Sequence, residues 1–229
     1  MTAAATPRTL GIVVLGLGHR TLAGMVGDAR SHPEGTLVER VHAEDLLRKA
    51  AQADPELLES VAEAARRLVA KGADLVATSC GYFSPFQRPL AAALPVPVFT
   101  TPMMELATLL ASLPEDRTVL VVAAVAHGVD DRCLAACGVR AEDMSRVVVV
   151  GMDRPGHFED SVLTHRVDPE EDAFTAQVVD VVGEAMTESV GAIVLECGEM
   201  PAAAAAVRER FAVPVVDYGS YLDAAVRTR

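Results

Sequence analysis

Two stretches of the chain share one pattern: residues 72–81 read GADLVATSCG, and residues 191–200 read GAIVLECGEM. Each is an apolar run that ends at a cysteine followed by glycine, and a Val-Pro-Val run comes after each cysteine. The proline of that run stands 17 residues after Cys80 in one half and 17 residues after Cys197 in the other. Repetition at a fixed spacing predicts a duplicated strand–cysteine–helix–strand unit, and therefore two related lobes.

Short apolar runs recur along the rest of the chain and alternate with helical patterns. Strands are expected at Leu10–Leu15, Leu37–Val41, Asp74–Ala77, Val96–Phe99, Val119–Val125, Val147–Val150, Ala192–Leu195 and Val213–Val216. Continuously apolar runs are typical of parallel strands that helices cover on both faces. Helix starts such as Asp54-Pro55 stand between them. The predicted fold class is therefore α/β, a parallel sheet with right-handed crossovers.

The repeat also divides the chain. We expect an N-terminal lobe of residues 1–100 plus 213–229 and a C-terminal lobe of residues 101–212. The last strand and helix are assigned to the first lobe because they repeat elements of the first half. The C-terminus is therefore expected to pack back onto the N-terminal lobe.

Charge and composition exclude several classes of function. With 20 Lys+Arg against 32 Asp+Glu the net charge is −12, and the aromatic residues are 6 Phe, 3 Tyr and no Trp. Such a chain lacks the basic, aromatic surface that binds nucleic acid, and the basic surface that binds an anionic membrane. No apolar run approaches the roughly 20 residues that span a bilayer, and no export signal is visible. We expect a cytoplasmic protein with reduced thiols.

The motifs of common cofactors and metals are missing from the sequence. Gly16-x-Gly18 lacks the third glycine of a dinucleotide fingerprint, and no glycine-rich phosphate loop with its lysine occurs. The chain's two lysines are both expected in or at the end of helices, away from any pocket where pyridoxal phosphate would need one. Cys133 and Cys137 have no histidine neighbours and are interpreted as structural, not as zinc ligands. We expect neither a cofactor nor a metal.

Cys80 and Cys197 are the candidate catalytic residues. Each stands at the carboxyl end of an expected strand, where open parallel sheets bind ligands, and each precedes a helix whose N-terminus is expected to lower the thiol pKa. If the lobes face each other, both thiols look into one cleft. One thiolate then removes a proton from a carbon beside a carboxylate or carbonyl, and the opposite thiol returns a proton to the other face. Two buried structural cysteines are the alternative.

Several other side chains are candidates for substrate binding. Glu199 would orient the Cys197 thiol or take its proton, or else only complement a helix dipole. Arg20 and His19 would hold a carboxylate, with a solvated loop as the alternative. The polar segment Asp153–Asp168 is either a mobile lid or an exposed loop. The remaining candidates stand beside the cysteines or at other strand ends: Gly81, Tyr82, Gly198, Thr100, Thr101 and His127. Helix capping is the alternative role of the two threonines.

The two quoted segments resemble the cofactor-independent aspartate/glutamate racemase superfamily, which includes hydantoin racemases, maleate cis–trans isomerases and arylmalonate decarboxylases. The resemblance rests on the repeat, on a cysteine at a strand end in each half and on the spacing of 117 between Cys80 and Cys197. It implies two pseudosymmetric lobes, each a mostly parallel four-stranded sheet flanked by helices, with the active site in the cleft between them. Racemases and maleate isomerases of this superfamily use both thiols, whereas decarboxylase members keep only one. The presence of both cysteines therefore favours the first two activities.

The chain departs from the amino-acid racemases around the cysteines. Gly81-Tyr82 stands where those enzymes have Asn-Thr, and Gly198 stands where they have Thr. Ala124 is among the residues that replace the threonines holding the substrate carboxylate. Only Glu199 resembles the aspartate-racemase type. The pattern therefore supports the catalytic pair better than it supports an α-amino acid substrate.

The expected function is that of a cofactor-independent racemase or epimerase, acting on a small carboxylate or carbonyl compound by two-base proton transfer between Cys80 and Cys197. One alternative is a maleate-type cis–trans isomerase that forms a covalent cysteine adduct. Another is a small-molecule-binding relative that has lost turnover. The expected partner is the small-molecule substrate, with no nucleic acid and no membrane, and the sequence leaves open whether the chain forms a homo-oligomer.

Overall fold

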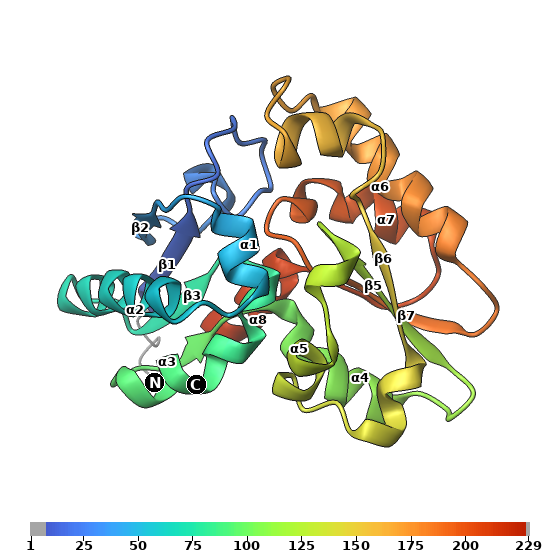
Figure 1. The fold of residues 1–229 in the computed structure, drawn as a ribbon, viewed down its shortest axis with the longest axis horizontal. Helices are drawn as coiled ribbons and strands as arrows, with labels where there is room; N and C mark the ends of the chain where they lie inside the picture. Colours follow the sequence, from blue (N-terminus) through green and yellow to red (C-terminus); the bar gives the residue numbers. More distant parts are fainter. Residues whose placement is uncertain (1–7, 228–229) are drawn as a thin grey trace, which may run out of the picture.

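The computed structural model describes residues 8–227 and contains two lobes side by side, each built on a four-stranded sheet (Figure 1). The first sheet has the order β2-β1-β3-β4, formed by β1 Leu10–Leu15, β2 Leu37–Val41, β3 Leu75–Thr78 and β4 Val98–Phe99. The second has the order β6-β5-β7-β8, formed by β5 Thr118–Ala123, β6 Val147–Gly151, β7 Val190–Leu195 and β8 Val215–Val216. All neighbouring strands pair in parallel. The predicted α/β fold with two parallel four-stranded lobes is confirmed.

The two sheets have the same strand order, so β3 and β7 occupy equivalent positions. β1 and β3 are buried along their whole length, and so is β7 apart from Gly191. Burial on both faces explains why these runs are continuously apolar. The carboxyl ends of β3 and β7, which the two repeated cysteines follow, therefore lie at equivalent places in the two lobes.

Helices connect the strands and cover the sheets. They are α1 Leu46–Ala51, α2 Pro55–Ala70, α3 Gln87–Ala93, α4 Leu106–Ser112, α5 Asp131–Ala136, α6 Glu171–Ala185, α7 Ala204–Arg210 and α8 Tyr218–Arg227. Short 3₁₀ turns lie at η1 Ala29–Ser31, η2 Gly81–Phe86, η3 Pro102–Glu105, η4 Ala126–Gly128, η5 Ala141–Arg146 and η7 Met200–Ala203, and a π-helical turn lies at η6 Glu159–Leu163. The predicted start of α2 is confirmed, because Asp54 accepts hydrogen bonds from the N–H groups of Glu56 and Leu57, with Pro55 at the first position.

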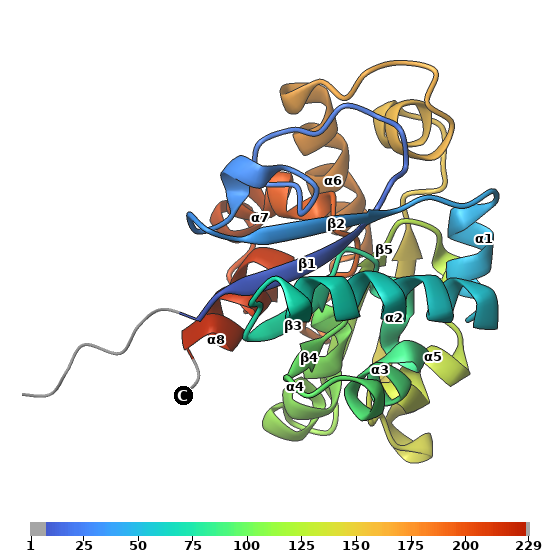
Figure 2. The same ribbon diagram turned by 90° about the vertical axis from the view of Figure 1, so that its left-hand side faces the viewer.

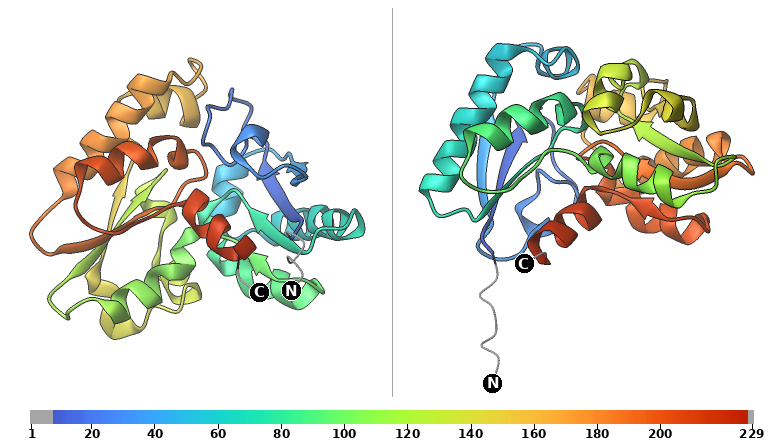
Figure 3. Two further views of the ribbon diagram at one scale, coloured as in Figure 1. Left: turned by 180° about the vertical axis from the view of Figure 1, so that it is seen from behind. Right: turned by 90° about the horizontal axis from the view of Figure 1, so that it is seen from below.

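The first sheet is enclosed by α2 on one face and α8 on the other. Figure 2 shows α2 crossing in front of β1 and β3. On the opposite face, Leu10 and Ile12 of β1 pack in one cluster with Tyr218 and Leu222 of α8. In Figure 3 the C-terminal helix, coloured red, lies against the blue and green half of the molecule.

The chain returns to the first lobe later than residue 213. Val215–Val216 pairs with β7 inside the second sheet, so only the following helix α8 joins the N-terminal lobe. The reason is in the repeat: the first Val-Pro-Val run pairs with β3 of its own lobe, and the second run pairs with β7 in the same way. Within residues 8–227, no helix has the length and apolar character needed to cross a membrane.

Candidate active site

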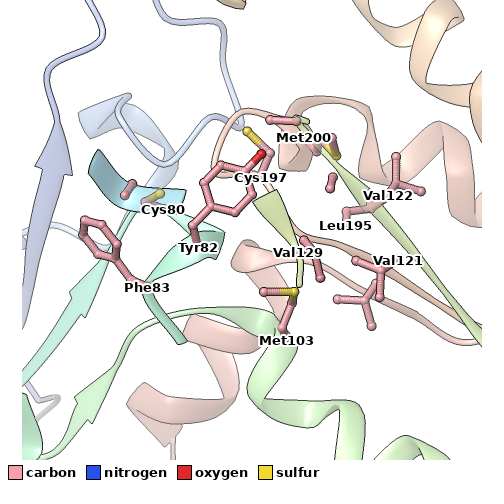
Figure 4. Packing of buried hydrophobic residues seen from close by; sticks show 14 of the residues in the cluster. Cys80, Tyr82, Phe83, Met103, Val121, Val122, Val129, Leu195, Cys197 and Met200 are labelled. Carbon is pink, nitrogen blue, oxygen red and sulfur yellow. The ribbon is translucent and has the colours of Figure 1, made fainter. Parts of the chain in front are cut away.

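Cys80 and Cys197 line one small cavity at the junction of the lobes. Cys80 stands between β3 and η2, and Cys197 is the second residue after β7. These cysteines are 6% and 8% exposed, so both are nearly enclosed. Figure 4 shows them approaching from different lobes, with Tyr82 beside them. The structure thus brings together the two thiols of the repeat, and their catalytic role stays a prediction.

Apolar side chains close this cavity, which we call the thiol cavity. Its volume is about 20 Å³, which is room for about one water molecule. Its polar lining consists of Ser79, Tyr82, Glu196 and Glu199 in addition to the thiols, and its apolar lining consists of Leu15, Leu17, Leu47, Ala124, Val162 and Leu163 around Gly81. Leu47 comes from α1 and Leu163 from η6, so elements of both lobes cover the thiols.

The expected lowering of the thiol pKa values was wrong. Burial raises the pKa of the Cys197 thiol well above its usual value, and the carboxyls of Glu199 and Glu196 raise it further. Burial likewise raises the pKa of Cys80, with Glu196 as the next cause, and only a backbone hydrogen bond involving Tyr82 acts in the opposite direction. A short 3₁₀ turn follows each cysteine, and its end is too weak to outweigh dehydration and nearby negative charge. Both thiols are therefore protonated at neutral pH in this closed form.

Glu199 contacts the Cys197 thiol directly. Sγ of Cys197 donates a hydrogen bond to Oε2 of Glu199 at 2.7 Å. Oε1 of the same carboxylate lies 3.7 Å from Nε2 of His19, whose side chain is only 4% exposed. Glu199 was expected either to contact the thiol or to complement a helix dipole, and the structure shows the contact with the thiol.

His19 completes a chain of contacts from the thiol. Its Nδ1 donates to the carbonyl of Arg20 at 2.9 Å, and its Nε2 has no hydrogen-bond partner among the described residues. Burial is the largest single influence on the pKa of His19 and lowers it, but the contact with Glu199 and the hydrogen bond to Arg20 together raise it, so the net change is upward. His19 also stacks on His165, with the ring centroids 5.8 Å apart.

Glu196 is the residue that the sequence analysis missed. It directly precedes Cys197, and it is 1% exposed. Burial raises the pKa of its carboxyl to about 8, and the charge of Glu199 acts in the same direction, against a hydrogen bond from the N–H of Ala124. A signal was present in the sequence, because a glutamate at the end of a fully apolar strand is rare unless it has a partner or a function.

Gly81, Tyr82 and Gly198 hold the lobes together at the thiols. A side chain at Gly81 would overlap the Glu196 carboxyl, and one at Gly198 would overlap the carbonyl of Ser79 in the other lobe. The carbonyl of Gly198 also accepts the N–H of Val26 at 2.8 Å. Gly81 and Tyr82 line the thiol cavity, whereas Gly198 supports the close approach of the lobes next to it.

Arg20 lies in a neighbouring pocket of about 350 Å³. That pocket also contains His19, Arg40 and His42, and it shares Glu199 with the thiol cavity. Arg20 itself does not line the thiol cavity. A role in holding a substrate carboxylate stays a prediction.

The other candidates lie outside the thiol cavity. Thr100 is buried, with its hydroxyl donating to Gln87 at 2.8 Å, and the hydroxyl of Thr101 caps η3 by accepting the N–H of Met103. Thr101 thus has the capping role that was its alternative, whereas Thr100 has a different structural contact, to the side chain of Gln87. His127 lines an open pocket of about 630 Å³, and Tyr82 lines both this pocket and the thiol cavity.

Residues 153–168 reach the thiol cavity through the middle of the segment. They include η6, whose Val162 and Leu163 line the cavity and whose Ser161 is buried. His157 of this segment accepts the N–H of Glu170 at 2.8 Å. The middle of the segment therefore covers the thiols, whereas residues 164–168 are exposed.

The second cysteine pair is buried away from that cavity. Cys133 donates to the carbonyl of Gly128 at 3.5 Å, and neither Cys133 nor Cys137 lines the thiol cavity. Burial raises the pKa of Cys133 to about 11 and that of Cys137 to about 12. Within the described residues, the His, Cys, Asp and Glu side chains form no group of three placed to hold a metal ion.

The comparisons with known proteins agree with the fold. A family model described as Asp/Glu/Hydantoin racemase matches residues 20–226. Unliganded arylmalonate decarboxylase is 21% identical and has a TM-score of 0.59 over 96% of this chain and 91% of its own. Allantoin racemase from Klebsiella pneumoniae is 19% identical, with a TM-score of 0.57 over 95% of this chain and 86% of its own.

A curated protein is also similar in sequence. Dimethylsulfoniopropionate lyase 5 of Emiliania huxleyi (strain CCMP1516) is 28% identical over 170 residues, which are 72% of this chain. The match spans 34% of that protein, so this chain corresponds to about a third of its relative's length.

Proposed function

The chain belongs to the Asp/Glu/hydantoin racemase family, and on that premise we propose that it is a cofactor-independent racemase or epimerase. Its substrate is a small compound with an acidic C–H bond beside a carboxylate or carbonyl group. One observation carries the proposal: Cys80 and Cys197, from equivalent strand ends of the two lobes, line the same enclosed cavity. A carbon between two such thiols has one proton donor or acceptor on each face, as inversion requires.

The contact between Cys197 and Glu199 gives the reaction its starting base. The Cys197 thiol passes its proton to the carboxylate that accepts its hydrogen bond at 2.7 Å, and a thiolate results. The thiolate removes the proton from one face of the substrate carbon, so that a C–H bond breaks and an S–H bond forms. The Cys80 thiol donates its proton to the other face, which leaves Cys80 as the thiolate and the carbon inverted. Because burial disfavours a free thiolate, substrate binding and deprotonation are expected to be coupled.

A substrate enters only when the side chains that close the thiol cavity move. The closed cavity of about 20 Å³ is far smaller than any carboxylate compound. Leu47 of α1 and Leu163 of η6 belong to different lobes and both line it. Separation of the lobes, with α1 and η6, therefore opens the path to the thiols, and closure excludes water during proton transfer.

An elimination is the second candidate. The similarity to dimethylsulfoniopropionate lyase 5 favours it, because an elimination begins with the same removal of a proton and continues by loss of a group from the neighbouring carbon. The described lining of the thiol cavity supports this candidate too: it includes the carboxylate of Glu199 but no Lys or Arg, which suits a substrate that carries a positive charge.

Proton NMR in deuterated buffer tests the proposal. A panel of chiral carboxylates, hydantoins and β-substituted carboxylates is incubated with the wild-type protein. Exchange of the α-proton with loss of optical rotation supports a racemase, an alkene product supports the lyase, and deuterium at a former alkene carbon supports a maleate-type isomerase. Absence of any reaction across the panel, or full activity of the Cys80→Ser/Cys197→Ser double variant, would overturn the two-thiol proposal.

A further inference from the structure

The Glu196 carboxyl occupies the junction between the two lobes. It comes from the residue after β7, and its Oε2 accepts the N–H of Ala124, after β5, at 3.1 Å. On the other side it lies against Gly81 of the first lobe, where a Cβ atom would overlap Oε1. Glycine at this position is therefore what leaves room for the carboxyl beside the cysteines. The same carboxyl lines the thiol cavity together with Cys80 and Cys197.

We propose that Glu196 is a third catalytic residue, whose protonated carboxyl donates a hydrogen bond to the carbonyl or carboxylate oxygen of the substrate as the neighbouring carbon loses its proton. This role rests on the proposed function, because it concerns the same cavity and the same proton transfer. It assigns a task that neither thiol performs.

Removal of a proton beside a carbonyl needs such a donor. When the C–H bond breaks and the thiolate gains the proton, the electron pair of that bond moves onto the substrate oxygen. The negative charge there must be stabilised by groups already in place. No Lys or Arg is among the described residues that line the thiol cavity. A neutral carboxylic acid fills this need: its proton shifts toward the substrate oxygen as charge develops and returns when the opposite thiol protonates the carbon.

The surroundings of Glu196 keep its proton in place. Titratable side chains from every neighbouring element face it: Cys80 and Tyr82 at η2, Cys197 and Glu199 after β7, and Tyr218 at the start of α8. Burial raises the pKa values of the thiols and phenols, so these groups are neutral at pH 7. Burial and the charge of Glu199 raise the pKa of Glu196 to about 8.

The two glutamates of the cavity therefore divide the work. Glu199 accepts the thiol proton of Cys197 and faces His19, so its position suits a base. Glu196 accepts only a backbone N–H in the described structure, and its buried, protonated carboxyl lines the cavity, so it suits an acid. Two carboxyls whose environments separate their proton affinities commonly serve as an acid and a base.

Glu196→Gln tests the role kinetically. Glutamine keeps the shape and an N–H donor but has no proton to shift, so we expect kcat for α-proton exchange to fall about 10²-fold with KM little changed. The wild-type rate should decline above about pH 8, where the carboxyl ionises and repels the enolate, and this decline should be absent in the variant. The matched control is Glu209→Gln, an exposed glutamate of α7, which should behave as the wild type.

The outcomes separate the two proposals. Wild-type exchange together with an unchanged rate and pH profile in Glu196→Gln would overturn the role of Glu196 and leave the racemase proposal standing. If the wild type exchanges no substrate of the panel, both fall. A structural role for Glu196 alone would lower stability without moving the alkaline limb.

A substrate-free measurement tests the protonated carboxyl itself. In protein labelled with carbon-13 at the glutamate carboxyls, one resonance should titrate near pH 8, and it should vanish in Glu196→Gln. The wild-type titration suffices if the variant does not fold. Absence of any glutamate carboxyl that titrates above about pH 6 would overturn the proposal whatever the substrate is.

Discussion

The hydroxyl of Tyr82 bridges the lobes by bonding twice to one residue, Val125. It accepts the N–H of Val125 at 2.7 Å and donates to the carbonyl of Val125 at 3.1 Å. Tyr82 belongs to η2 of the first lobe, and Val125 follows β5 of the second. A single side chain thus satisfies both backbone groups at the end of the central strand, beside the thiols.

Tyr82→Phe should destabilise the protein by about 1–3 kcal/mol, because it leaves the N–H and carbonyl of Val125 without their partner. Urea unfolding followed by circular dichroism measures the change. Tyr221→Phe is the control, since its hydroxyl makes no hydrogen bond in the described structure and it should cost far less. Equal losses for the two variants would contradict the bridging role.

The Cys80→Ser and Cys197→Ser variants should each abolish interconversion. A serine hydroxyl is too weak an acid to serve as the base at neutral pH, but the remaining thiol still exchanges the proton on the face it contacts. Each variant should therefore exchange deuterium into one enantiomer only, and the two variants should select opposite enantiomers. Proton NMR of pure enantiomers reads this out, and racemisation at the parental rate by either variant would remove that cysteine from the mechanism.

Alkylation by iodoacetamide should be slow at pH 7 and should accelerate about tenfold per pH unit, because burial raises the thiol pKa values and only the thiolate reacts. Cys80 and Cys197 should react before Cys133 and Cys137, because opening of the thiol cavity exposes only the first pair. Peptide mapping after brief exposure identifies the sites. Faster labelling of the Cys133/Cys137 pair would show that the cavity does not open.

Stability should fall as pH rises from about 5 to 8. Burial first, and then Glu199, raises the pKa of Glu196 from 4.5 to about 8, so the folded state keeps a proton that the unfolded state releases in this range. Raising the pH therefore favours unfolding, by up to about 4 kcal/mol for a shift of this size. Urea unfolding at pH 5.5, 7 and 8.5 should show a steeper decline for the wild type than for Glu196→Gln. Parallel declines would contradict the assignment.

Gly81→Ala should displace the Glu196 carboxyl, since its Cβ atom would overlap Oε1. We expect a loss of about 1–3 kcal/mol from overpacking, seen as a lower melting temperature in calorimetry, together with loss of exchange activity. The control is Gly183→Ala in α6, where the nearest atom to a Cβ, on Phe211, lies at an ordinary 3.7 Å. A Gly81→Ala protein that melts and exchanges as the wild type would contradict the contact.

The sequence was sufficient for the lobes and the thiol pair because both follow from regular patterns, the apolar runs and the repeat. Continuous apolar runs occur where helices cover both faces of a sheet, and every expected strand has a counterpart within a few residues. Cys80 and Cys197 share a cavity because equivalent strand ends face one another across the lobes.

The pKa values of the site residues could not be predicted from the sequence, because they depend on how deeply each side chain is buried. The pKa values of the thiols reflect their burial in the tertiary structure and the nearby carboxyls of Glu196 and Glu199, and no local pattern encodes that burial. Glu196 has its partners at Ala124 and Gly81, more than seventy residues away, so its role depends on tertiary contact. The boundary at residue 213 failed for a different reason, because α8 and not the preceding strand returns to the first lobe.

Tyr218 joins the two segments that connect the lobes. The chain passes between the lobes after β4 and again after β8, and the hydroxyl of Tyr218 at the second passage donates to the carbonyl of Thr100 at the first, at 2.9 Å. The two connecting segments are thus joined at one buried point. We therefore expect any relative motion of the lobes to turn about Thr100 and Tyr218, so that the side chains farthest from this point travel the greatest distance.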